Sequence, residues 1–223
     1  MGLTSRKKRP LARSVGVLRD ARLIVVATEG TKTEKEYFEF FGRENKRVKV
    51  NVLETQGGFS APIHVLSRLK EFKKKYELGG SDELWLVVDK DRWPDEQLSQ
   101  VASEAHRSRF KLAVSNPCFE LWLYMHLDDL TPDMIDKPCS YFEEKVRTIL
   151  GGFNPSNLNM EQFEPKARIA VRRAEALDVN PDERWPIHSG TRVYKIVRTI
   201  LRMRIEGVSL SREIIRERRS YRF

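Results

Sequence analysis

The sequence predicts an α/β fold built on a mostly parallel four-stranded sheet, in the order 2-1-3-4, with helices on both faces and a C-terminal helical extension. Apolar runs rich in β-branched residues at 21–27 and 84–88 indicate buried strands. Alternating apolar and polar residues at 48–53 indicate a half-exposed strand. Helical segments separate these strands, as parallel neighbours require, because the chain must cross over between them.

The helices and the fourth strand follow from local signals. A helix is expected after the first strand, because Thr31 and Glu34 have the capping-box spacing and an aromatic stripe follows, made up of Tyr37, Phe38, Phe40 and Phe41. Pro62 and Pro94 favour the starts of the next two helices, since proline fits a first helical turn. Residues 110–114 are expected to form the fourth strand.

Beyond residue 116 the chain is expected to be helical, in the segments 117–126, 138–150, 165–177 and 191–205. At 223 residues it has room for one sizeable core with a small appendage. The expected division is a basic N-terminal arm at 1–20, an α/β domain at 21–126, and helices at 127–223 that pack on the same core.

The composition is that of an ordinary globular protein, with 40% hydrophobic and 33% charged residues. No apolar stretch approaches the roughly 20 residues of a membrane span, and the basic residues 1–13 lack the apolar run of a secretory signal. A cytoplasmic protein that does not bind a membrane is expected. Cys118 and Cys139 form no CxxC pair, so the sequence suggests neither a disulfide nor a zinc site, and two buried, reduced thiols are expected.

The formal net charge of +9 is concentrated at the two ends of the chain. The basic clusters are Arg6, Lys7, Lys8 and Arg9 at one end and Arg212, Arg216, Arg218, Arg219 and Arg222 at the other. Such clusters attract polyanions, and this makes RNA or DNA a candidate partner. A solvated basic tail that only aids solubility fits the charge equally well.

Three acidic residues follow two of the predicted strands. Glu29 ends the first strand, and Asp89 and Asp91 end the third. In the order 2-1-3-4 these strands are neighbours about 4.8 Å apart, so their acids could share one cation at the carboxyl edge of the sheet. Oxygen ligands alone suit Mg²⁺ or Mn²⁺, which can orient water and neutralise a scissile phosphate. The alternative is that all three are exposed loop acids.

A fourth acid, Glu120, lies in a helix that is apolar nearly all round and is therefore expected to be buried. Asn116 is expected to cap this helix, which would bring both residues to the same edge. A role in positioning metal or water and an ordinary capping or helix-dipole role stay open for the pair. Lys32, Lys90 and Arg92 are candidates for phosphate contacts, or for solvated surface.

Three segments carry a resemblance to a known family: Glu29-Gly30 with Thr33-Glu34, Val87-Val88-Asp89-Lys90-Asp91, and Asn116-Pro117-Cys118-Phe119-Glu120-Leu121-Trp122-Leu123. Over residues 23–125 the sequence resembles RloB family proteins, which are encoded beside restriction and abortive-infection systems. That family is similar to the Toprim nucleases, in which a glutamate after the first strand and an Asp-x-Asp pair bind Mg²⁺. The resemblance implies a Toprim-like domain, phage defence, and metal-binding roles for Glu29, Asp89 and Asp91.

Two hypotheses follow. The first is a Mg²⁺-dependent endonuclease in which Glu29 is a ligand or the general base and Asp89 and Asp91 are ligands. Glu120 would be an additional ligand or would hold another ligand in position. The family resemblance implies RNA, tRNA included, as the substrate. The second is a non-catalytic nucleic-acid-binding subunit that works with partner proteins of a defence locus and keeps the acids as relics. The oligomeric state stays open. A small-nucleotide hydrolase would need a longer glycine-rich loop than Gln56-Gly57-Gly58.

Overall fold

Five strands form one sheet in the order β2-β1-β3-β4-β5. They are β1 (Arg22–Thr28), β2 (Val48–Leu53), β3 (Glu83–Asp89), β4 (Lys111–Asn116) and β5 (Gly190–Thr191). The computed structural model describes residues 21–43, 48–55 and 60–203. The predicted basic arm at 1–20 and the basic cluster near the C-terminus lie outside the described residues.

The four predicted strands and their order 2-1-3-4 are confirmed. The pairs β1–β2, β1–β3 and β3–β4 are all parallel. The fifth strand was not predicted, because a two-residue strand has no periodicity to detect. It runs antiparallel to β4, with Thr191 opposite Ser115 and Gly190 opposite Asn116. Thr191 therefore belongs to the sheet, and the helix expected to begin there spans residues 193–203 within the described part of the chain.

Helices connect and cover the strands. They are α1 (Thr33–Arg43), α2 (Pro62–Lys75), α3 (Asp95–Arg107), α4 (Phe119–Leu127), α5 (Cys139–Leu150) and α6 (Ala167–Leu177). Short 3-10 turns lie at η1 (Pro132–Met134), η2 (Met160–Gln162) and η3 (Glu164–Lys166). None of the helices within the described ranges is long and apolar enough to cross a lipid bilayer.

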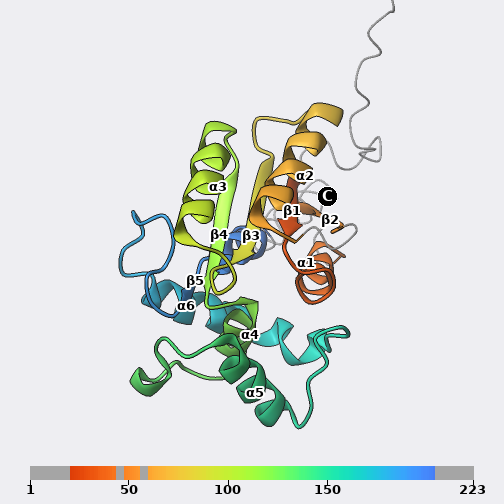
Figure 1. The fold of residues 1–223 in the computed structure, drawn as a ribbon. Coiled ribbons are helices and arrows are strands. Elements are labelled where there is room, and N and C mark those ends of the chain that lie inside the picture. The colour runs from red at the N-terminus through yellow and green to blue at the C-terminus, as the bar shows by residue number, and fades with distance from the viewer. Residues whose placement is uncertain (1–20, 44–47, 56–59, 204–223) are drawn as a thin grey trace, which may run out of the picture.

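Alternate side chains of β1 enter two separate hydrophobic cores, because successive residues of a strand point to opposite faces of the sheet. Leu23, Val25 and Ala27 pack with α2 and α3. Ile24 and Val26 pack with α1, α4, α5, α6 and the helix at 193–203. Figure 1 shows α2 and α3 together in front of the sheet, and α4 and α5 below it. Helices therefore cover both faces, and the C-terminal helices share the core on the α1 side.

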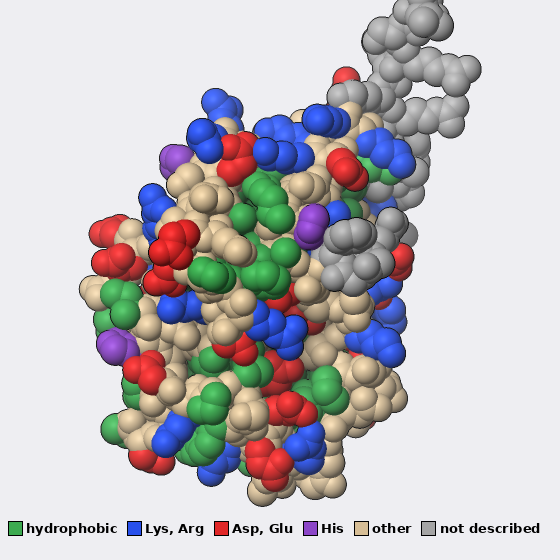
Figure 2. Space-filling model, viewed as in Figure 1, with side chains coloured by type: hydrophobic (Ala, Val, Ile, Leu, Met, Phe, Trp, Pro, Cys, Tyr) green, Lys and Arg blue, Asp and Glu red, His purple; other side chains and the backbone are tan. Residues whose placement is uncertain are grey.

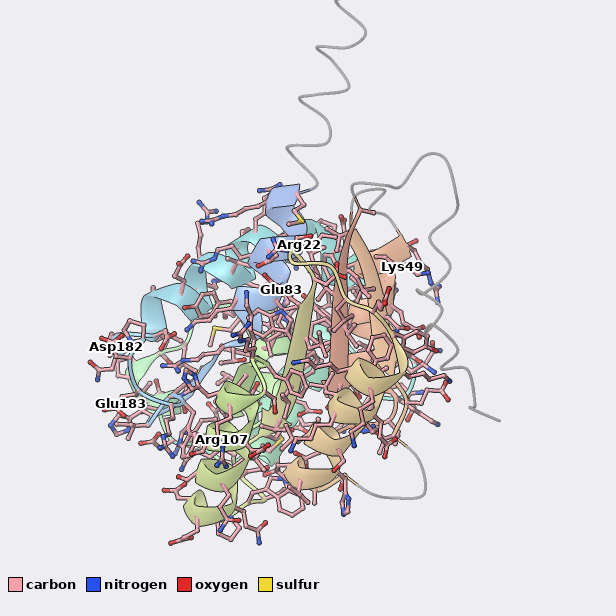
Figure 3. The ribbon with its side chains drawn as sticks, turned by 90° about the horizontal axis from the view of Figure 1, so that it is seen from above. Arg22, Lys49, Glu83, Arg107, Asp182 and Glu183 are labelled. Atoms are coloured by element: carbon pink, nitrogen blue, oxygen red, sulfur yellow. A yellow bond between two sulfur atoms is a disulfide. The ribbon has the colours of Figure 1, made fainter. Side chains whose placement is uncertain are left out.

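A buried carboxylate joins three strands at their amino ends. Glu83 forms an ion pair with Arg22 of β1 and accepts a 2.6 Å hydrogen bond from Lys111 Nζ of β4. The indole Nε1 of Trp85 donates to the other oxygen of Glu83 at 2.7 Å. Arg22 and Glu83 lie side by side in Figure 3. Because each oxygen of this carboxylate has partners, its burial is compensated and the starts of the strands are held in register.

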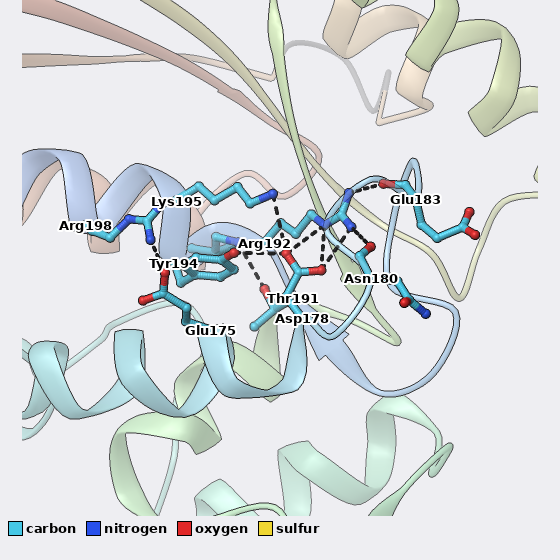
Figure 4. Close-up of polar contacts among 10 residues, drawn as sticks. Glu175, Asp178, Asn180, Glu183, Thr191, Arg192, Tyr194, Lys195 and Arg198 are labelled. Atoms are coloured by element: carbon cyan, nitrogen blue, oxygen red, sulfur yellow. Dashed lines mark hydrogen bonds and ion pairs between the residues drawn. The ribbon is translucent and has the colours of Figure 1, made fainter.

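A second buried ion pair holds β5 against β4 (Figure 4). Arg192 Nη2 lies 2.9 Å from Asp178 Oδ1, and the hydroxyl of Tyr194 donates to Oδ2 at 2.9 Å. Burial alone would raise the pKa of Asp178, but the hydrogen bonds from Arg192 and Tyr194 outweigh it and hold the pKa below its usual value. The ion pair joins the two ends of the loop between α6 and β5. It thereby holds β5 in place beside the last residues of β4.

A buried histidine links α1 to α4. His126 Nδ1 lies 2.9 Å from the carbonyl oxygen of Trp122, and its Nε2 lies 3.0 Å from the hydroxyl of Tyr37. A carbonyl only accepts, so Nδ1 must carry the proton and Nε2 accepts from Tyr37. Burial lowers the pKa of His126 to about 4. The folded protein therefore keeps this imidazole neutral.

We expect His126 to reduce the stability of the protein in mild acid. Its pKa is about 4 in the fold against an ordinary 6.5, so the unfolded chain takes up the extra proton as the pH falls from 6.5 toward 4, and folding stability is lost over that range. From pH 7.5 to pH 5 the loss is about 2 kcal/mol. Urea unfolding of the protein and of His126→Gln at both pH values measures it. Equal pH dependence in the two proteins would contradict the prediction.

Candidate metal centre

The parallel pairing of β1 with β3 brings acids from both strands to the same edge of the sheet. Thr28 pairs with Val87, and the amide of Glu29 continues the ladder by donating to the carbonyl of Val87 at 3.2 Å. Glu29 thus lies beside Asp89, the last residue of β3. Figure 2 shows Asp and Glu side chains gathered in the middle of the face viewed, between the surface of α2 and α3 and that of α4 and α5.

Glu29 is held in place by two donors. The indole Nε1 of Trp93 lies 3.0 Å from each of its carboxylate oxygens, and the amide of Asp89 donates to Oε2 at 3.3 Å. Burial raises the pKa of Glu29, although the hydrogen bonds from Trp93 and Asp89 act against it. The Glu29 side chain is therefore buried, oriented and close to Asp89, as expected for the end of β1.

Glu34 is a member of the acidic group that the sequence did not reveal. Instead of returning to Thr31 as in a capping box, its Oε1 accepts a 3.0 Å hydrogen bond from the amide of Gly30. A Cβ at Gly30 would lie 2.0 Å from Glu34 Oε2, so only glycine permits this approach. Burial, with smaller effects of Glu120 and Glu29, raises the pKa of Glu34 to about 7. Its position in the first turn of a helix that begins at the same edge was the available signal.

Asp89 lies at the centre of the group. Burial raises its pKa well above the usual value, and Glu34, Glu120, Glu29 and Asp91 raise it further. The Asp91 residue as a whole is exposed. Partial desolvation of its carboxyl still raises the pKa of that group, and the charge of Arg92 acts against this rise. Desolvated carboxylates that repel one another favour proton or cation binding. Their all-oxygen donor set fits a hard divalent cation such as Mg²⁺ or Mn²⁺.

Glu120 comes to this edge from the first turn of α4, a helix whose side chains are otherwise mostly buried, as expected. Its carboxyl is half-buried. Burial raises its pKa, with further contributions from Glu143 and Asp91. Glu120 thus interacts electrostatically with both Asp89 and Asp91, although α4 lies far from them in the sequence.

The prediction that Asn116 caps α4 is wrong. The residue before the helix is Cys118, and it makes no side-chain capping bond. The Asn116 amide instead donates to the carbonyls of Pro186 at 3.1 Å, Ile187 at 2.7 Å and His188 at 3.2 Å. Two residues separate Asn116 from the helix, and the segment before β5 supplies these acceptors. The side chain fixes that segment to the end of β4.

The expectation of two reduced thiols is also wrong. Cys118 and Cys139 form a disulfide, with their Cα atoms 5.6 Å apart. Cys118 directly precedes α4 and Cys139 begins α5, so the disulfide joins the N-terminal ends of these two helices. No sequence spacing indicated that the two ends lie close together. Within the described residues, the group of three whose potential ligand atoms lie within 4.8 Å of one another is Asp91, Cys118 and Cys139. Glu29, Asp89 and Asp91 do not form so tight a group.

The three basic candidates follow the same two strands as the acids, Lys32 after β1 and Lys90 and Arg92 after β3. Lys32 and Arg92 are exposed, and Lys90 Nζ lies 3.6 Å from Asp95. Arg92 lowers the pKa of Glu29, Asp91 and Glu120 electrostatically, without forming an ion pair with another described residue. Positive charge is therefore available beside the carboxylates for an anionic substrate.

A mostly parallel sheet in which the first four strands have the order 2-1-3-4, with helices on both faces, defines a Toprim-like α/β protein. The chain belongs to the RloB-like protein family, whose model matches residues 24–200. No curated protein and no solved structure matches it. The matched span contains β2 to β5, all of β1 except its first two residues, and all five carboxylates of the candidate centre.

We expect Asp89→Asn to stabilise the metal-free protein, because the amide removes a desolvated charge that four neighbouring acids oppose. At pH 8 without divalent ions, the gain is on the order of 1 kcal/mol, or about 2–4 °C in Tm. Mg²⁺ should raise the Tm of the parent protein and have little effect on the variant. Thermal unfolding with and without Mg²⁺ measures both. The control is Asp95→Asn, which changes an exposed acid nearby; a lower Tm for Asp89→Asn than for this control would refute the prediction.

Proposed function

We propose that the protein is a metal-dependent endonuclease that hydrolyses phosphodiester bonds in nucleic acid. The observation that supports this is the group of carboxyls where β1 and β3 end, each with a raised pKa: Glu29, Glu34, Asp89, Asp91 and Glu120. Acids with raised pKa values that gather at a ligand-binding edge of an α/β sheet favour a functional role over a structural one.

Glu29, Asp89 and Asp91 would hold Mg²⁺ or Mn²⁺. Glu120 would be an additional ligand or would hold another ligand in position. A divalent ion held there supplies Lewis acidity toward a phosphate oxygen and activates water. Because Asp91 is exposed while Glu29 is buried, the centre opens to solvent on the Asp91 side, where a nucleic-acid backbone could enter.

The surrounding residues divide the remaining tasks. Trp93 orients the Glu29 carboxylate through both of its oxygens. A carboxyl whose pKa is near 7, as for Glu34, can accept a proton from water at neutral pH, and Glu29 is the second candidate for that role. Lys32, Lys90 and Arg92 would contact phosphates beside the acids. Asn116 is a weaker candidate for substrate contact, since three carbonyls already engage its amide.

Family membership supports the biological setting of the proposal. The resemblance to RloB proteins and through them to Toprim nucleases favours phage defence in the cytoplasm and RNA, tRNA included, as the substrate. A specific feature favours a second candidate: the net charge of +9, concentrated at the chain ends, suits a nucleic-acid-binding subunit that works with partner proteins and does not cut. Cleavage by the purified chain separates the two.

We expect the purified protein to cut RNA or DNA in the presence of Mg²⁺ or Mn²⁺ and not in EDTA. Glu29→Gln and Asp89→Asn should each reduce the rate by about 100-fold or more, because each removes one charged ligand while keeping the shape of the side chain. Asp95→Asn is the matched control and should cut at the parent rate. Labelled tRNA, single-stranded RNA and duplex DNA, resolved on gels, provide the readout.

Two results would reject the nuclease. One is parent-level cutting by Asp89→Asn, and the other is binding of these nucleic acids without cutting under every metal condition. The second result would establish the non-catalytic subunit instead.

Trp93→Phe tests the positioning of Glu29. The ring packing survives, but the indole donor to both Glu29 oxygens is lost, so the pKa of Glu29 should rise. We expect a roughly 10-fold to 100-fold fall in cleavage or in Mg²⁺ affinity. The fall should be larger at pH 6 than at pH 8, because a carboxyl with a higher pKa is protonated more at the lower pH. A pH-independent fall would mean that Trp93 acts only through packing.

A further inference from the structure

Two sulfur atoms and two carboxyl groups meet beside the candidate metal centre. The ligand atoms of Asp91, Cys118 and Cys139 lie within 4.8 Å of one another. Glu120 Oε2 lies 3.3 Å from Cys139 Sγ. Cys118 is buried, Cys139 is half-buried and Asp91 is exposed, so the group is open to solvent on one side. A small reductant and a metal ion can therefore reach it.

We propose that this group, once its disulfide is reduced, is a binding site for a thiophilic divalent cation, with Zn²⁺ as the natural occupant. Cys118, Cys139 and Asp91 supply three ligands, and Glu120 or water supplies the fourth. Zn²⁺ accepts both thiolate sulfur and carboxylate oxygen as ligands, whereas Mg²⁺ prefers oxygen alone. The site therefore differs in its donors from the oxygen-only centre formed by Glu29 and Asp89.

The geometry requires only small movements. Tetrahedral zinc with Zn–S bonds of about 2.3 Å places its two sulfurs ~3.8 Å apart. The Cα atoms of Cys118 and Cys139, 5.6 Å apart, allow that separation after rotation of the side chains. The 3.3 Å between Glu120 Oε2 and Cys139 Sγ is already suitable for two ligands of one ion. A disulfide sulfur carries no hydrogen, so this contact can become an S–H···O hydrogen bond only after reduction.

The local backbone also favours thiolates. Cys118 directly precedes α4, and Cys139 is the first residue of α5, so both lie at the positive ends of helix dipoles. The nearby carboxylates oppose deprotonation of the thiols, and a bound divalent cation removes that opposition. Metal binding and loss of the thiol protons are therefore linked.

Reduction precedes binding. A dithiol reductant breaks the Cys118–Cys139 bond by thiol–disulfide exchange: two electrons and two protons pass from the reductant to the protein, giving two thiols, and the reductant becomes a disulfide. The cation then displaces the two thiol protons, which leave to water. Asp91 belongs to both donor sets, so Zn²⁺ bound here should withdraw it from the proposed nuclease centre; this consequence, unlike the site itself, rests on the proposed function.

Co²⁺ tests the site directly, because tetrahedral cobalt thiolates absorb through sulfur-to-metal charge transfer. The full-length protein is reduced with a dithiol, freed of reductant under argon, assayed for two thiols per chain, and titrated with Co²⁺. The chain has two cysteines, so no other thiol contributes. We expect one Co²⁺ per chain with a charge-transfer band, displaced by one equivalent of Zn²⁺. The oxidised protein should show no such band.

Cys118→Ser and Cys139→Ser should each weaken the band strongly, and the half-buried Cys139 keeps the test usable if the buried Cys118 variant does not fold. Asp91→Asn should weaken Co²⁺ affinity about 10-fold or more while the band persists. Asp95→Asn is the control and should bind as the parent does. A disulfide that resists reduction in the folded protein, or reduced protein that gives no charge-transfer band, would overturn the proposal. Neither outcome bears on nucleic-acid cleavage, which is measured separately.

Discussion

Partly desolvated carboxylates repel one another at the edge of the sheet where β1 and β3 end. The parallel register of β1 with β3 places Glu29 beside Asp89. Burial and neighbouring acids raise the pKa of both. This arrangement disfavours the metal-free fold, so the stability that permits it must come from elsewhere in the molecule. Such a group of carboxyls favours the uptake of protons or of a cation, which is the basis of the proposed function.

Two other buried carboxylates have partners of opposite charge. Glu83, with Arg22, Lys111 and Trp85, ties the strands at their opposite ends. The Asp178–Arg192 pair fixes β5 on β4. These two buried carboxylates have partners on their oxygens, whereas Asp89 faces other acids. The contrast separates two kinds of buried acid. An acid with a partner of opposite charge has its burial compensated, whereas an acid that faces other acids favours binding of a proton or a ligand.

The disulfide changes how the candidate centre is understood. It joins the starts of α4 and α5, and α4 is the helix that carries Glu120. Reduction or oxidation of the disulfide therefore affects the position of the Glu120 carboxylate. It also determines whether thiol groups are available as metal ligands beside Asp91. Oxygen and sulfur atoms that could bind a metal lie next to each other, so under our proposal the thiol–disulfide state would decide which class of metal the exposed side of the group prefers.

Hydrophobic periodicity and local helix signals were enough to predict the four parallel strands, the helices between them, and the positions of Glu29 and Asp89 at the ends of two strands, because such patterns are encoded locally. The order 2-1-3-4 was also predicted and is confirmed, although no local pattern encodes it. Four features could not be predicted, because they depend on tertiary contacts: the turn of Glu34 toward Gly30, the bonds of Asn116 to the segment before β5, the short strand β5, and the pairing of Cys118 with Cys139. The last three depend on where the chain returns after a long excursion. The turn of Glu34 depends on its close approach to Gly30, which is defined by the packing around that glycine. Local sequence patterns encode neither this packing nor the return of the chain.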